Sequence, residues 1–210
     1  MVLKNKYNLI APFYSLLSKL VFGNNLINIQ LELIKTLPTQ GKLLIIGGGN
    51  GKILPYIFSH SSKLSIDYVE ASSKMIEMAQ SKAPSTQDIS FIHSDKLAKS
   101  EFAYDAVYLA FFLDLFNSQK IQEWLKSIES ICDPNFTLHV ADFHLSPATK
   151  FNLYRRLQVK ASILFFKIVA KHRTDKLQDI FKIIAQSNYK SLTMRTLKGG
   201  FYRSQVFTKG

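Results

Sequence analysis

The sequence has few of the residues that mark several classes of protein. A single cysteine, Cys132, among 210 residues excludes an internal disulfide and a CxxC metal site, and we expect no metal centre. The lack of a clean apolar run of about 18 residues argues against a membrane-spanning helix. No stretch rich in proline, glycine or serine divides the chain, so a single domain over residues 1–210 is predicted.

Acidic residues are also scarce. The chain has 15 Asp and Glu against 27 Lys and Arg, and this net charge of +12 favours nucleic acid, an anionic membrane surface or an acidic substrate as a partner. Lys4 and Lys6 precede a short apolar segment that resembles a secretory signal, but Pro12, Tyr14 and Lys19 interrupt it. We therefore expect a cytoplasmic protein.

Glycine is infrequent, but four of the nine glycines gather in one place. The apolar residues 43–46 are followed directly by Gly47, Gly48, Gly49 and Gly51. Four branched aliphatic residues bounded by glycine indicate a strand buried on both faces of a parallel sheet. Residues 53–58 then repeat apolar side chains at helical spacing, with Pro55 in the first turn. The unit is a strand, a glycine loop and a helix, in which the loop lets a ligand approach the backbone.

The spacing of the glycines restricts the ligand. A dinucleotide fingerprint G-x-G-x-x-G requires glycine where Lys52 stands, and the observed pattern is G-x-G-x-G. A second strand over residues 64–69 ends at Glu70, about 20 residues beyond the loop, where an acid accepts hydrogen bonds from ribose hydroxyls and repels a 2′-phosphate. An NADP site is therefore not expected.

Several segments together resemble the class I S-adenosylmethionine-dependent methyltransferases. They are the glycine loop, Glu70-Ala71-Ser72-Ser73-Lys74-Met75, Ser94-Asp95 and Tyr104-Asp105-Ala106-Val107. The resemblance covers roughly residues 42–142. It implies an α/β, three-layer Rossmann-like fold with a seven-stranded, mostly parallel sheet in the order 3-2-1-4-5-7-6.

The rest of the chain agrees with that fold. Further strands are expected at residues 89–93, 104–110, 137–141, 190–197 and 201–207. The clearest helix spans residues 121–131, with Ser118 as its N-cap, and Ser72 caps another. Lys198-Gly199-Gly200 marks a C-terminal antiparallel hairpin, whereas a dinucleotide dehydrogenase would continue with parallel crossovers.

The resemblance also implies S-adenosyl-L-methionine as the cofactor, S-adenosyl-L-homocysteine as its product, and a set of binding residues. That set is Tyr14, Gly47, Gly48, Gly49, Gly51, Glu70, Ala71, Met75, Asp95, Lys96, Ala110 and Phe111. In the family, Glu70 matches an acid that binds the ribose, and Asp95 one that accepts from the adenine amino group, while the next backbone N–H donates to the ring. Core packing for Met75 and a solvated turn for Asp95 are the structural alternatives.

One position departs from the family. An Asp or Glu usually stands two residues before the first glycine and helps hold the methionine amine, and here that residue is Ile45. The amine would rely on carbonyls near Gly47 and Ala110. A protein that binds the cofactor weakly, or has kept the fold without the reaction, is the alternative interpretation.

Two segments are expected to cover the site. Residues 1–37 form an N-terminal helical cap, in which residues 7–14 resemble the segment that lies over the cofactor in quinone-pathway and related small-molecule methyltransferases, so Tyr14 and Tyr7 line the site by that resemblance. Residues 150–173 form an inserted cap helix with a basic stripe, for which peripheral contact with an anionic membrane is the alternative.

Methyl transfer is an in-line displacement that depends on alignment of the two reactants. A base is needed for a phenol, an acidic carbon or a protonated amine, and His144, after the fifth strand, is the expected catalytic base, followed by Asp142 and Tyr14. The apolar residues 112–116 and the apolar face of the cap helix favour a small apolar or aromatic acceptor, and core packing is the structural alternative for residues 112–116. RNA is the alternative acceptor. Polyamine transfer is disfavoured, because Ala110-Phe111-Phe112 stands where carboxylates are needed.

Overall fold

The fold was analysed on a computed structural model, which describes residues 22–98, 103–144 and 178–210. Tyr7, Tyr14, most of the expected N-terminal cap and the whole of the inserted cap over residues 150–173 lie outside the described residues. The statements below concern the described part of the chain.

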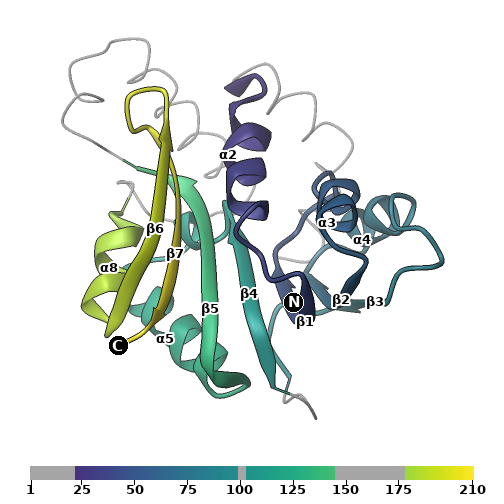
Figure 1. Cartoon of the computed structure of the whole chain (residues 1–210). Coiled ribbons are helices and arrows are strands. Elements are labelled where there is room, and N and C mark those ends of the chain that lie inside the picture. Colours follow the sequence, from purple (N-terminus) through teal and green to yellow (C-terminus); the bar gives the residue numbers. More distant parts are fainter. Residues whose placement is uncertain (1–21, 99–102, 145–177) are drawn as a thin grey trace.

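A seven-stranded sheet forms the centre of the molecule (Figure 1). Its order is β3-β2-β1-β4-β5-β7-β6, with β7 antiparallel to both β5 and β6 and the other neighbours parallel. The strands are β1 (Gln40–Ile46), β2 (Lys63–Glu70), β3 (Ile89–His93), β4 (Tyr104–Ala110), β5 (Cys132–Phe143), β6 (Tyr189–Leu197) and β7 (Tyr202–Lys209). The predicted fold class and strand order are confirmed.

Helices cover both faces of the sheet. The helices α2 (Asn25–Ile34), α3 (Leu54–His60) and α4 (Ser73–Gln80) contribute to the hydrophobic core on one face, and α5 (Ser118–Glu129) and α8 (Ile180–Gln186) to the core on the other. Figure 1 shows α3 and α4 beside β1 to β3, and α5 and α8 near β5 to β7. A short 3-10 helix, η1 (Leu113–Leu115), follows β4.

Strand β1 is buried on both faces, as its apolar run predicts. Leu43 and Ile45 belong to the core beneath α2 and α3, while Leu44 and Ile46 belong to the core beneath α5 and α8. Each of the four is at most 2% exposed. Full burial stabilises each side chain by roughly 1.5–3 kcal/mol, so this strand anchors the loop that follows it.

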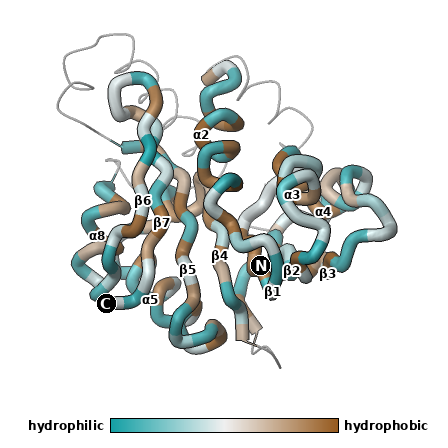
Figure 2. The backbone as a smooth tube through the Cα atoms, in the orientation of Figure 1, coloured by the Kyte–Doolittle hydropathy of each residue, from teal (hydrophilic) through white to brown (hydrophobic). Residues whose placement is uncertain are grey.

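The amphipathic helices follow their sequence patterns closely. Figure 2 shows hydrophobic and hydrophilic residues alternating along α2, whose Ile29 and Leu33 are buried. The predicted cap of α5 is wrong by one residue: the side chain of Asn117, not Ser118, accepts a hydrogen bond from the N–H of Lys120. In the described residues no helix combines the length and apolarity needed to cross a bilayer.

Candidate cofactor and acceptor site

The glycine loop leaves β1 through alternating positive φ angles. Gly47, Gly49 and Gly51 have φ values of 67°, 63° and 70°, a region that L side chains rarely adopt. The N–H of Gly47 donates to the carbonyl of Val69 at 2.9 Å, so the loop stays tied to β2 as it turns.

Three of the four glycines are required by close packing within the protein. A Cβ atom would lie 2.5 Å from the Phe112 ring at Gly47, 2.3 Å from the Tyr68 ring at Gly48, and 2.7 Å from the Cα of Ala79 at Gly51. A Cβ at Gly49 would meet nothing within 4 Å. Gly49 is therefore the glycine at which the loop backbone is open to a ligand.

Tyr68 in β2 fixes the glycine loop through its hydroxyl group. Its side chain is fully buried in β2, and its hydroxyl donates to the carbonyl of Gly49 at 2.9 Å. Burial, together with the nearby carboxylate of Glu70, raises the pKa of Tyr68 well above its ordinary value, so the hydroxyl keeps its proton. Sequence reasoning did not single out this residue, because it occupies an ordinary core position in the strand.

Glu70 joins the loop to the start of α4. One carboxylate oxygen accepts from the N–H of Gly49 at 3.0 Å and the other from the N–H of Ser72 at 2.9 Å. The residue is 9% exposed. Burial raises the pKa of Glu70, and the amides of Ser72 and Gly49 act in the opposite direction by stabilising the carboxylate.

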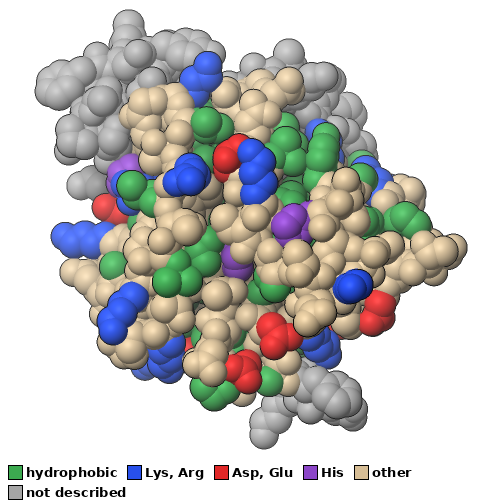
Figure 3. All heavy atoms as spheres, viewed as in Figure 1, with side chains coloured by type: hydrophobic (Ala, Val, Ile, Leu, Met, Phe, Trp, Pro, Cys, Tyr) green, Lys and Arg blue, Asp and Glu red, His purple; other side chains and the backbone are tan. Residues whose placement is uncertain are grey.

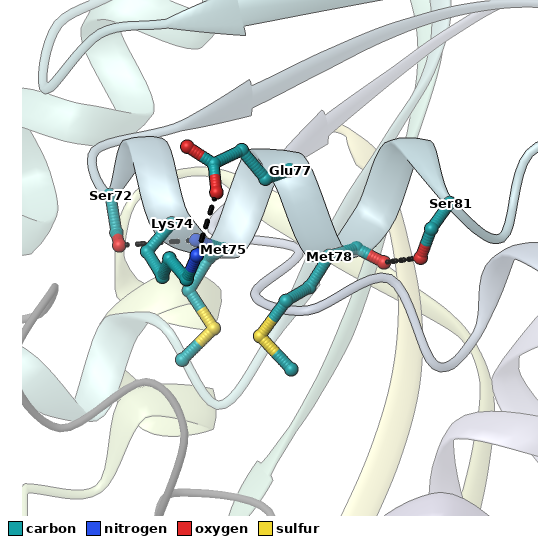
Figure 4. Close-up of polar contacts among 6 residues, drawn as sticks. All are labelled: Ser72, Lys74, Met75, Glu77, Met78 and Ser81. Carbon is teal, nitrogen blue, oxygen red and sulfur yellow. Dashed lines mark hydrogen bonds and ion pairs between the residues drawn. The ribbon is translucent and has the colours of Figure 1, made fainter.

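Helix α4 begins immediately after Glu70 and Ala71. The hydroxyl of Ser72 accepts from the N–H of Met75 at 3.2 Å, which confirms the predicted N-cap (Figure 4). Met75 is buried and Met78 half-buried, and Figure 4 shows both side chains on the same side of the helix.

The turn after β3 lies next to Glu70. The N–H of Ser94 donates to the carbonyl of Glu70 at 3.1 Å, and the Nε2 of His93 lies 3.0 Å from the carbonyl of Ala71. Asp95 and Lys96 are both exposed there, and the N–H of Lys96 donates to the Ser94 hydroxyl at 3.1 Å. The structure thus brings the glycine loop, Glu70, Ala71 and the Asp95 turn to one edge of the sheet.

The end of β4 is strained. Phe111, directly after Ala110, has a φ of 52°, which for an aromatic residue costs about 1–2 kcal/mol. Its N–H donates to the carbonyl of Ala141 at 2.8 Å, which holds it beside β5. Strain of this kind gathers at functional sites, where the surroundings enforce it.

An aromatic cluster surrounds Phe111 at this edge. Phe143 is its centre, with ring centroids 5.0 Å from Phe111, 5.3 Å from Phe22 and 5.4 Å from Phe201. Tyr202 packs on both Phe143 and Phe201. These five residues come from β4, β5, the β6–β7 hairpin and the segment before α2, so only the tertiary fold assembles the cluster.

Ile45, which replaces the family's usual acid, lies in a tightly packed row. Tyr68 and Tyr108 flank it in register on β2 and β4, and all three are at most 1% exposed. The hydroxyl of Tyr108 donates to the side-chain carbonyl of Gln30 in α2 at 3.2 Å. A carboxylate at position 45 would be enclosed by this packing, so the apolar residue matches its surroundings.

His144 packs toward α8 and β7. Its Nε2 lies 3.0 Å from Nη2 of Arg203, its Nδ1 lies 3.8 Å from the Asp179 carboxylate, and its ring meets Phe181 edge to face. Because a guanidinium only donates, Nε2 accepts and the imidazole is neutral. Burial, then the charge of Arg203, lowers the pKa of His144.

Two buried carboxyl groups lie nearby, one in η1 and one at the end of β5. Asp142 is fully buried, and the carboxyl oxygens of Asp114 are shielded from solvent. Sequence reasoning ranked Asp142 behind His144 and passed over Asp114. The available signal was a lone acid within an otherwise aliphatic and aromatic stretch, residues 109–116.

The strand order, the glycine loop and the acid at the end of β2 together define the class I S-adenosylmethionine-dependent methyltransferase fold. Residues 44–137 match the family described as a methyltransferase domain, so this part of the chain is similar to methyltransferase domains.

Solved structures share this fold at low sequence identity. The pyocyanin biosynthetic protein PhzM matches with a TM-score of 0.66 and 14% identity over 94% of this chain and 62% of its own. An O-methyltransferase family protein from Burkholderia thailandensis matches with a TM-score of 0.67 and 13% identity over 92% of this chain and 59% of its own. The cyclopropane synthase MmaA2 from Mycobacterium tuberculosis matches with a TM-score of 0.63 and 11% identity over 87% of this chain and 82% of its own.

The chain therefore spans less than two thirds of the length of PhzM and of the Burkholderia protein. No curated protein matches the sequence.

Proposed function

We propose that this protein transfers the methyl group of S-adenosyl-L-methionine to a small apolar or aromatic acceptor. The observation that carries the proposal is the carboxylate of Glu70, fixed by two backbone amides beside the open backbone of Gly49. A carboxylate so placed, at the carboxyl ends of β1 and β2, suits the two hydroxyls of a ribose.

The surrounding residues fit the cofactor. Each carboxylate oxygen of Glu70 accepts one amide hydrogen bond and has a further lone pair for a ribose hydroxyl. Asp95 and Lys96 would hold the adenine, because their turn is tied to the Glu70 carbonyl through Ser94. The cofactor supplies the activated methyl group, so the protein's task is to align the acceptor with it and exclude water.

Ile45 changes how the loop is held. With no acid in β1, the hydroxyl of Tyr68 fixes the Gly49 carbonyl, and the methionine amine has only the carbonyls near Gly47 and Ala110. A protein that binds the cofactor without catalysing transfer is the second candidate, and the absence of an acid at this position is the observation that favours it.

The aromatic cluster around Phe143 supports an apolar or aromatic acceptor, since flat rings pack well on such a surface. The printed names of PhzM and of the Burkholderia O-methyltransferase family protein agree with a small-molecule acceptor. Figure 3 shows the basic side chains of the described residues scattered over the face drawn, and RNA stays the alternative acceptor.

A titration with S-adenosylmethionine and S-adenosylhomocysteine, followed by thermal shift and calorimetry, tests the proposal. Binding of either compound raises the melting temperature in proportion to the logarithm of its concentration. No response at millimolar concentration refutes the cofactor assignment. Binding without transfer of labelled methyl to any small aromatic compound or to RNA supports the non-catalytic candidate, and retention of RNA on a filter at low salt supports an RNA acceptor.

A further inference from the structure

The carboxyl groups of Asp114 and Asp142 are buried and incompletely paired. Within residues 22–98, 103–144 and 178–210, neither oxygen of Asp114 has a hydrogen-bond partner, nor has Oδ2 of Asp142, whose side chain is 0% exposed. Its other oxygen accepts from the N–H of Phe143 at 2.8 Å. Buried polar atoms are nearly always paired, so three unpaired oxygens in two neighbouring side chains call for an explanation.

The topology places this pair where an acceptor would bind. Ala110 at the end of β4 is in parallel register with Ala141 in β5, so Asp142 lies at the carboxyl edge of the sheet next to the strained Phe111. Asp114 follows in η1, and the N–H groups of Leu113 and Asp114 face the Asp142 carboxylate. Ligands of open parallel sheets bind beyond this edge.

The surroundings of the pair favour retention of one proton. Burial raises the pKa of Asp114, and burial together with the charge of Asp114 raises that of Asp142. The nearest titratable side chains along the strands are Arg203, which is in register with Asp142 on β7, and the neutral His144. The guanidinium of Arg203 contacts His144 and the Phe181 ring. Among the described residues no lysine or arginine forms an ion pair with either carboxyl group.

We propose that Asp114 and Asp142 act together as the base that accepts a proton from an acceptor hydroxyl during methyl transfer; this inference rests on the proposed function. The acceptor class is a phenolic or enolic alcohol. As the acceptor oxygen bonds to the methyl carbon, the carbon–sulfur bond breaks and its electron pair stays on sulfur. The hydroxyl proton passes to the singly protonated pair, which becomes neutral.

This assignment explains the unpaired carboxyl oxygens, which a purely structural role leaves unexplained. A carboxyl pair with unmade hydrogen bonds destabilises the folded protein, and such groups are typical of sites where a proton must be held or moved. His144 is the weaker candidate, because its Nε2 lone pair already accepts from Arg203. Accepting a proton also leaves the buried pair uncharged, which its apolar surroundings favour.

The test uses Asp114→Asn and Asp142→Asn, which keep the side-chain size but cannot take up the proton. Asp88→Asn, at an exposed position before β3, is the matched control. The first readout needs no substrate: melting temperature is recorded from about pH 5 to pH 9. The wild type and control are expected to lose stability as the pair ionises, and each pair variant is expected to lose less.

The second readout is transfer of labelled methyl from S-adenosylmethionine to phenol, catechol and 1-naphthol. Each pair variant is expected to lower kcat by about 10²–10³-fold with unchanged cofactor affinity, since a general base contributes on that scale. Transfer by the variants within about threefold of wild type, or identical pH profiles of stability for wild type and variants, overturns the inference. If the wild type binds the cofactor but methylates none of the three compounds, the inference fails while the cofactor assignment stands.

Discussion

The four glycines of the loop have two different roles, close packing within the protein and approach of a ligand. Gly47, Gly48 and Gly51 make room for Phe112, Tyr68 and Ala79, whereas nothing occupies the space over Gly49. Three of the four glycines in this motif therefore serve packing, and one serves ligand approach. Substitutions at different glycines can separate packing from ligand binding.

Gly48→Ala and Gly49→Ala are expected to fail in different ways. At Gly48 the new methyl group meets the Tyr68 ring, so the free energy of unfolding should fall by at least about 1–3 kcal/mol. At Gly49 the cost is about 1–2 kcal/mol of backbone strain, and S-adenosylmethionine should bind roughly tenfold more weakly because the methyl group enters the open space. Urea denaturation and calorimetry measure the two effects. Normal affinity in folded Gly49→Ala would contradict a ligand at this glycine.

Glu70→Gln tests the ribose contact. The amide can satisfy only one of the two N–H groups that Glu70 binds, and it loses the charge that strengthens hydrogen bonds to hydroxyls. Calorimetry should show S-adenosylmethionine binding at least about tenfold more weakly. Glu77→Gln, at an exposed position in α4, is the control and should bind normally. Equal affinities for both variants would place the ribose elsewhere.

At the scale of secondary-structure elements, the start of α4 connects the sheet edge to the site. Ser72 donates its N–H to Glu70 and accepts from the N–H of Met75 through its hydroxyl, so one residue fixes both the carboxylate and the first turn. The first turn of α4 is thereby held directly after Glu70.

Ser72→Ala should lower the free energy of unfolding by about 1 kcal/mol, because the first turn loses its side-chain cap. Ser81→Ala removes a hydroxyl at the other end of α4, where Ser81 donates to the carbonyl of Met78 in an exposed position (Figure 4). That control should change stability by less than about 0.5 kcal/mol. Urea titrations of both variants give the comparison, and equal losses would argue against the capping role.

At the scale of the whole molecule, a buried histidine joins α2 to the sheet. His139 in β5 is 1% exposed, with Thr36 at 3.0 Å from Nδ1 and Thr137 at 2.9 Å from Nε2. Since the Thr36 hydroxyl donates to the carbonyl of Leu33, it accepts from Nδ1–H, and Thr137 donates to Nε2. Both nitrogens are satisfied only when the ring is neutral.

Stability should therefore depend on pH through His139. Burial lowers the pKa of His139 from its ordinary 6.5 to about 4. Between these values the unfolded chain binds a proton that the folded chain does not, so the contribution is present above pH 6.5 and is lost as pH falls toward 4. The whole effect is on the order of 3 kcal/mol.

The measurement compares wild type with His139→Asn in denaturation at several pH values, because the difference cancels the opposite pH dependence of Asp114 and Asp142. The stability advantage of the wild type should be largest near pH 8 and shrink toward about pH 4. A constant advantage over that interval would mean that His139 takes up a proton as readily in the folded chain as in the unfolded chain, and would contradict the lowered pKa.

Local sequence pattern predicted the strands and the Ser72 cap, because apolar periodicity and turn residues act over a few neighbouring positions. The predicted strand order came from the resemblance to the methyltransferase family. It also placed Glu70 and the Asp95 turn, since each directly follows a strand. The same reasoning missed Asn117 as the cap of α5, where two adjacent residues both suit the position and backbone geometry decides between them.

The sequence by itself thus determined the sheet and the edge at which a ligand binds, because the order of buried strands and glycine turns dictates both. Only the tertiary structure decided that Tyr68 secures the loop, that Ile45 lies between two tyrosines and that Asp114 meets Asp142. Those contacts join residues distant in the chain, and their consequences come from burial, which no local pattern encodes.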